Sequence, residues 1–111
     1  MPDIGNPNFF KIYRGRYPYT DANGATHYVM VGNTGEVVFM DALTSNANKI
    51  LGQMATEATP TENIIFLART SSDNSIGWVR VKSDGVIDCE KANQVYQLRG
   101  ISYNMSLNWY K

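Results

Sequence analysis

Residues 101–109 read Ile-Ser-Tyr-Asn-Met-Ser-Leu-Asn-Trp, and this C-terminal stretch decides the fold class. Large apolar side chains stand at every odd position, and polar side chains stand at every even position. A period of two is typical of a β-strand with one face against a core and the other face toward water. We therefore expect residues 101–109 to form a half-buried strand.

The parity of this pattern changes at Gly100. Upstream of the glycine, Tyr96 and Leu98 place apolar side chains at even positions, whereas the apolar positions downstream are odd. One extra residue in the strand would bring both sets onto the same face, and a glycine inside a strand often marks such a bulge. The sequence therefore predicts a glycine β-bulge at Gly100.

Turn signals divide most of the remaining chain into short apolar runs. Asparagine, aspartate and glycine tolerate the left-handed backbone of tight hairpin turns, and an Asn-Gly pair suits a type I′ turn. Such hairpins at short spacing are typical of an antiparallel meander or sandwich. We therefore predict an all-β fold, an antiparallel β-sandwich built from hairpins. The signals are Asn23-Gly24, Gly32-Asn33-Thr34-Gly35, Asp73-Asn74 and Asp84-Gly85.

Residues 41–60 do not follow this pattern. Ser45 is a possible helix N-cap, apolar residues follow it at helical spacing, and Pro60 would end a helix. We expect one short helical insertion around residues 45–55, in a place where it would cover a sheet edge.

The length of 111 residues suits one domain with a single core. Residues 1–8 are rich in proline, glycine and asparagine and are predicted to form an N-terminal arm or linker. Residues 9–111 are then a single β domain. The N-terminus lacks the basic start and apolar run of a secretory signal, and no stretch reaches the roughly 18 apolar residues of a membrane span. We expect synthesis in a cytoplasm without membrane insertion.

The charge composition limits the classes of partner. Ten basic and ten acidic residues give a formal net charge of zero, so no overall field attracts nucleic acid or an anionic membrane. A neutral chain also lacks the self-repulsion that keeps monomers apart. We expect a homo-oligomer that does not bind nucleic acid.

The sequence contains no arrangement typical of an enzyme. His27 is the only histidine and Cys89 the only cysteine, and neither stands in a nucleophile motif. The three nearby acidic residues do not suggest a catalytic carboxylate pair. Asp84 belongs to a turn, and Asp88 and Glu90 have the spacing of solvated charges on one strand face. One histidine and one cysteine are too few soft ligands for a metal site. We predict a non-enzymatic protein without a metal or cofactor, in which Cys89 is a small core residue.

The first candidate ligand-binding residues lie in an aromatic and basic stretch that we expect to be a loop. Its tyrosine rings and guanidinium groups form a combination that is used for sugars and for single-stranded nucleic acid. The alternative is a packing ribbon, with the rings over the rim of the core. The candidates in this stretch are Tyr13, Arg14, Arg16, Tyr17 and Tyr19.

Trp78 is the second candidate. It shares a strand face with Arg80 and Lys82, opposite Val79 and Val81. If the valines are buried, Trp78 points to solvent or to another subunit, because interfaces favour tryptophan and arginine. If both faces of the strand are covered, Trp78 is a second core residue. The sequence leaves both possibilities open.

Residues 77–87, Gly-Trp-Val-Arg-Val-Lys-Ser-Asp-Gly-Val-Ile, and the later run Gly100-Ile101-Ser102-Tyr103 resemble the terminal strands of viral and bacteriophage fibre heads. The shared patterns are a strand of the type W-x-R-x-x-x-D-G and a closing G-x-S-Y strand, and the resemblance covers about the last third of the chain. It implies a compact β-sandwich in a virion that trimerises and binds a host-surface glycan or protein. A fibre head normally follows a long repetitive shaft, whereas this chain has only a short arm.

Two functions are therefore expected. The first is non-enzymatic receptor binding by a virion protein, with the five residues of the aromatic stretch and Trp78 in contact with a host-surface glycan or protein. The second is structural: a protein that decorates or joins a capsid or tail without binding a ligand, with Trp78 and the tyrosine-rich stretch buried between subunits. Net neutrality disfavours a third possibility, an oligonucleotide-binding barrel.

Overall fold

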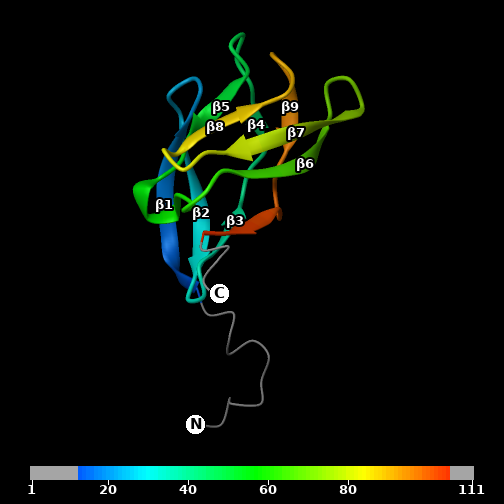
Figure 1. Ribbon diagram of the computed structural model, residues 1–111. Coiled ribbons are helices and arrows are strands. Elements are labelled where there is room, and N and C mark those ends of the chain that lie inside the picture. The colour runs from blue at the N-terminus through cyan, green and yellow to red at the C-terminus, as the bar shows by residue number, and fades with distance from the viewer. Residues whose placement is uncertain (1–12, 106–111) are drawn as a thin grey trace, which may run out of the picture.

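The computed structural model describes residues 13–105, which form one strongly curled antiparallel sheet (Figure 1). The predicted all-β fold built from antiparallel hairpins is confirmed. The N-terminal arm and the last part of the expected C-terminal strand, with Leu107 and Trp109, lie outside the described residues. The strands are β1 (Tyr13–Asp21), β2 (Thr26–Gly32), β3 (Glu36–Phe39), β4 (Leu43–Thr44), β5 (Ile50–Gln53), β6 (Ile64–Thr70), β7 (Ser75–Val81), β8 (Val86–Cys89), β9 (Val95–Gln97) and β10 (Ser102–Asn104).

The sheet is strongly curled, and the chain itself connects its two ends. Its strand order is β10-β3-β2-β1-β5-β8-β7-β6-β9-β4. One end of this order is the pair of β10 and β3, and the other end is the pair of β9 and β4. The chain passes from β3 directly into β4 and from β9 directly into β10, so two continuous segments connect the two ends. Val37 of β3 pairs with Tyr103 of β10, and Leu43 of β4 pairs with Tyr96 of β9. The inner faces of the strands line one core, to which every strand contributes a buried residue.

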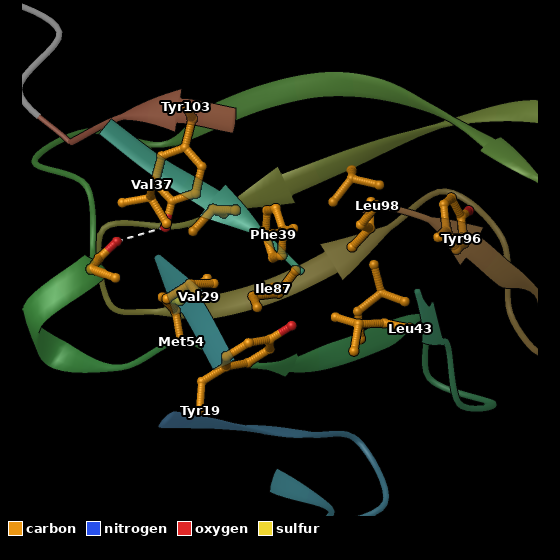
Figure 2. Close-up of a cluster of buried hydrophobic side chains, with 14 of the residues drawn as sticks. Tyr19, Val29, Val37, Phe39, Leu43, Met54, Ile87, Tyr96, Leu98 and Tyr103 are labelled. Atoms are coloured by element: carbon orange, nitrogen blue, oxygen red, sulfur yellow. Dashed lines mark hydrogen bonds between the residues drawn. The ribbon is translucent and has the colours of Figure 1, made fainter. Parts of the chain in front are cut away.

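Phe39 occupies the middle of this core (Figure 2). Its ring centroid lies 6.2 Å from that of Tyr19, 6.1 Å from that of Phe66 and 6.0 Å from that of Tyr103. These are tilted or edge-to-face contacts, the geometry that aromatic rings prefer. The four rings come from β1, β3, β6 and β10, so they join distant parts of the sheet.

The Asn23-Gly24 hairpin is confirmed, but its turn differs from the predicted type. A type I′ turn requires positive φ at both central residues. Here Gly24 has φ of 86°, and Asn23 is not among the residues with positive φ. Instead, the Asp21 carboxylate accepts hydrogen bonds from the backbone N–H groups of Asn23 and Ala25, each at 2.9 Å, and holds a wider loop. A side-chain acceptor therefore stabilises the turn.

The predicted bulge at Gly100 is confirmed. Gly100 has φ of 85°, and its N–H donates to the carbonyl of Phe39 while the N–H of Phe39 donates to the carbonyl of Ile101. Two consecutive residues thus face one residue of β3, which defines a bulge with glycine in the left-handed position. Tyr96 and Leu98 before the bulge and Tyr103 after it are all buried in the same core.

The prediction of a short helix around residues 45–55 is wrong. That region contains strand β5, and the only helical turn among the described residues is a 3-10 helix at Thr56–Ala58. Ser45 does not cap a helix, because its hydroxyl donates to the carbonyl of Lys91 at 2.7 Å and accepts the N–H of Gln94 at 2.9 Å. β5 fills the position between β1 and β8. Backbone pairing on both sides thus outweighs a weak local helix propensity.

Candidate functional site

The aromatic and basic stretch is a strand, not the loop that the sequence suggested. Residues 13–21 form β1 and pair along their length with β2. Strand alternation therefore sends successive side chains to opposite faces of the sheet. Tyr13 and Arg14 open the strand, and their side chains lie outside the described part of the structure. The stretch cannot present all its rings and guanidinium groups to one ligand.

Two of the candidate tyrosines belong to the inner face. Tyr17 packs against the core, and Tyr19 is a core residue with 3% of its surface exposed. The Tyr19 hydroxyl is buried without a hydrogen-bond partner in the described structure. Burial and the nearby carboxylates of Asp41 and Asp21 raise the pKa of Tyr19, so it stays neutral. These two tyrosines therefore pack on the core, as in the alternative to a ligand-contacting loop.

Arg16 lies on the outer face of β1. Its guanidinium carbon is 4.6 Å from the ring centroid of Tyr28 on β2, and both side chains are exposed. This distance is typical of a cation–π contact. The sheet order puts β5 and β8 between β1 and β7, so Arg16 and Trp78 lie in different parts of the sheet. The structure does not bring these two predicted site residues together.

Trp78 lies on the outer face of β7. Val79 and Val81 are completely buried, and Trp78 is half-buried on the opposite face. This arrangement fits the possibility that Trp78 points to solvent or to another subunit. The guanidinium carbon of Arg80 is 5.6 Å from the Trp78 ring centroid, and Arg80 also forms a two-point ion pair with Asp88, at 3.0 and 2.5 Å. Trp78 is therefore partly covered by its own neighbours, with the rest of its ring open.

Three exposed aliphatic side chains lie around Trp78. Their exposed fractions are 63% for Ile65, 68% for Leu67 and 60% for Ile76. Leu67 pairs directly with Trp78, Ile65 pairs with Arg80, and Ile76 pairs with Arg69, so all three share the outer face. We call the outer surface of β6, β7 and β8 around Ile65, Leu67, Ile76 and Trp78 the β7 face.

The aliphatic part of the β7 face was not predicted from the sequence. The signal that could have found it is the unbroken apolar run at residues 64–68, because a strand that is apolar on both faces is usually covered on both. In this fold one side of the run faces the core and the other side faces out. Contiguous apolar surface of this kind marks an interaction site more often than isolated exposed residues do.

Charged side chains border the β7 face, with opposite signs on opposite sides. Asp88 and Glu90 lie on the β8 side, where Glu90 Oε1 accepts the backbone N–H of Trp78 at 3.1 Å. Arg69 lies on the β6 side and pairs with Gln97 of β9. Asp88 is already paired with Arg80, whereas Glu90 and Arg69 are exposed.

An open depression lies at one end of the β7 face, by the turn between β6 and β7. It is not an enclosed pocket, and it lacks the carboxylate pairs and imidazoles that hydrolytic chemistry uses. Within residues 13–105, no cluster of histidine, cysteine and acidic side chains could hold a metal ion. The depression is lined by Leu67, Ala68, Arg69, Asn74, Ser75 and Ile76.

His27 lies between two carboxylates, away from the β7 face. Its Nε2 is 2.8 Å from Asp21 Oδ2, and its Nδ1 is 3.0 Å from Asp41 Oδ2. Partial burial lowers the pKa of His27, but the hydrogen bonds to Asp41 and Asp21 outweigh that effect and raise the pKa above its ordinary value. Because both ring nitrogens are engaged, the imidazole links the β1–β2 hairpin to the chain after β3 and is not placed to act as a base.

We expect the His27 link to weaken as the pH rises. The pKa of His27 is higher in the folded chain than its ordinary 6.5, so its stabilising contribution is complete below that pH and is lost as the pH rises through the folded pKa. The loss should be about 1 kcal/mol or less for each ion pair, because the pairs are partly exposed. Urea unfolding of the wild type at mildly acidic and at mildly basic pH measures it.

The control for this prediction is His27→Gln, which keeps polar contacts but does not titrate. His27 is the only histidine in the chain, so the variant should show a smaller change in the free energy of unfolding between the two pH values. An equal change in the wild type and the variant would show that other groups are responsible.

Cys89 is a core residue, as predicted. It is buried, its Sγ lies 3.4 Å from the carbonyl oxygen of Lys49 and 3.3 Å from that of Lys91, and burial raises the pKa of the thiol. A buried thiol with a raised pKa is a poor nucleophile.

Comparisons with protein families, with characterised proteins and with solved structures find no match to this chain. The fibre-head resemblance of the C-terminal third therefore stays a prediction. Within residues 13–105 the structure holds no membrane-spanning helix candidate.

Proposed function

We propose that this protein is a non-enzymatic assembly protein that associates with other copies of itself through the β7 face. The observation that carries the proposal is the contiguous group of Ile65, Leu67 and Ile76, each at least 60% exposed and grouped around Trp78 on one sheet face. Aliphatic side chains gain from burial against another apolar surface, and interfaces favour a tryptophan at their centre. The group is therefore suited to contact with protein.

Between the two functions that the sequence leaves open, this surface favours assembly over glycan recognition. Sugars are held by aromatic faces and by polar groups that converge on their hydroxyls, and aliphatic side chains supply neither. One face of the exposed Tyr28 ring is covered by Arg16. A virion as the place of assembly is the part of the proposal that comes from the fibre-head resemblance.

The association is expected to be weak. The face spans about three strands at about 4.8 Å each and about three rows of side chains at about 7 Å each. These dimensions give about 300 Å², well below the roughly 800 Å² that each partner of a specific interface usually buries, so the contact belongs to the weak, transient class. Because association also costs translational and rotational freedom, we expect a dissociation constant of about micromolar or weaker.

Sedimentation equilibrium across a micromolar to millimolar range of protein concentration tests the proposal. The wild type should gain mass with concentration, whereas Leu67→Asp should stay monomeric, because association would bury an unpaired charge at the centre of the contact. Tyr28→Asp is the matched control, since Tyr28 is also exposed on the outer face but lies on β2. The control should associate like the wild type.

Two results would contradict the proposed function. One is a wild type that stays monomeric at every concentration. The other is equal weakening by Leu67→Asp and Tyr28→Asp, which would show that the contact is not confined to the β7 face. Glycan-array binding that is lost in Trp78→Ala would instead support receptor binding by the same surface.

A further inference from the structure

The charged borders of the β7 face are complementary to each other. Across the sheet, one row of outer side chains runs from Asp88 through Arg80 to Ile65, and the next runs from Glu90 through Trp78 to Leu67. Arg69 lies two residues further along β6, beside Ile76. The β8 border is therefore acidic, and the β6 border carries a cation that is free of ion pairs within the described residues.

The direction of a two-fold axis decides which borders meet when two copies of this face are in contact. An axis in the interface plane and parallel to β6 and β7 exchanges the two sides, so the β8 border of each copy lies over the β6 border of the other. An axis in the same plane but perpendicular to the strands places each border of one copy over the same border of the other copy, with Glu90 near the partner's Glu90. The first arrangement joins opposite charges, and the second joins like charges.

The geometry points to a symmetric dimer with its two-fold axis parallel to β6 and β7, in which Glu90 of each copy meets Arg69 of the other at the rim of an apolar centre. This inference rests on the proposed function, because it names the partner arrangement at the same surface. The occupant of the β7 face is then a second copy of this chain. The absence of net charge removes long-range repulsion between the two copies.

Charge reversal tests this arrangement without changing the apolar centre. Arg69→Glu and Glu90→Arg should each weaken self-association about tenfold at low salt, because both rim contacts of the dimer become repulsive. An equimolar mixture of the two variants should associate about as tightly as the wild type, because both rim contacts are again between opposite charges. Sedimentation equilibrium of each variant and of the mixture supplies the comparison.

A second pair of variants separates charge from folding. Glu90 also accepts the N–H of Trp78, so Glu90→Arg removes a backbone partner as well as a charge. Glu90→Gln keeps that acceptor and should weaken association in the same direction but less than Glu90→Arg. The double variant Arg69→Glu with Glu90→Arg should recover self-association on its own, because every rim contact is reversed together.

The results separate this inference from the proposed function. If Leu67→Asp abolishes association but the charge reversals leave it unchanged, the β7 face is an interface and the inferred axis is wrong. If the mixture associates more tightly than the wild type, the perpendicular axis is correct. Growth beyond a dimer with rising concentration would show an open, head-to-tail contact and also overturn the inference. A wild type that remains monomeric would contradict both the proposed function and the inferred dimer.

Discussion

Phe39→Ala should lower the free energy of unfolding by about 3–5 kcal/mol. Phe39 is completely buried, and its ring contacts the rings of Tyr19, Phe66 and Tyr103, which come from three other strands. Truncation loses the free energy gained by moving the ring out of water, and it leaves a cavity inside the curled sheet. Hydrogen bonds between the strands hold the walls of that cavity in place. The surroundings therefore have little freedom to collapse into the space. Equilibrium unfolding in urea measures the loss.

Met40→Ala is the matched control for Phe39→Ala. Met40 is the next residue along the chain, and its side chain is exposed. Its truncation should change the free energy of unfolding by about 0.5 kcal/mol or less, as is usual for surface positions. Similar losses for the two variants would show that Phe39 is not at the centre of the core.

Gly52→Ala should be the second large effect, with a loss of about 1–3 kcal/mol or more. A Cβ at this position would lie 2.4 Å from the backbone carbonyl oxygen of Thr20, and backbone cannot turn aside as a flexible side chain can. Thr20 and Asp21 are the only β1 residues that pair with β5. The substitution therefore acts on a ladder of only two residue pairs and should separate β1 from β5.

Hydrogen exchange distinguishes this local separation from general destabilisation. The N–H of Ala22 donates to the carbonyl of Leu51 at 3.0 Å and should lose protection in Gly52→Ala. Amides that join β6 to β7 should keep their protection, because that hairpin lies on the other side of β8. Gln53→Ala, at an exposed neighbouring position, is the control. Uniform loss of protection throughout the sheet would contradict this account of Gly52.

The parts of the fold that were predictable from sequence are those in which local chemistry decides. The change of parity around Gly100 predicted a bulge, because only one extra residue could put Tyr96 and Tyr103 in one core. Hairpin turns were predictable for the same reason, since few residues adopt positive φ without strain. The opposite burial of Val79 and Trp78 followed from strand alternation once that strand was assigned.

The parts that were not predictable depend on distant partners. The segment at residues 50–53 is a strand because β1 and β8 supply hydrogen bonds on its two sides, and neither partner is visible in its local sequence. Ser45 has the chemistry of a helix cap, but its hydroxyl bonds to backbone more than forty residues away. The aliphatic part of the β7 face was missed because an apolar run does not reveal which side of a strand stays uncovered.

Methyl NMR of the wild type over a range of protein concentration tests most directly whether the β7 face is the interaction surface. We expect the methyl signals of Ile65, Leu67 and Ile76 to shift or broaden together as the concentration rises. The signals of Met30, on the outer face of β2, should stay unchanged. Changes confined to Met30 and its neighbours, with the three aliphatic signals constant, would contradict the account.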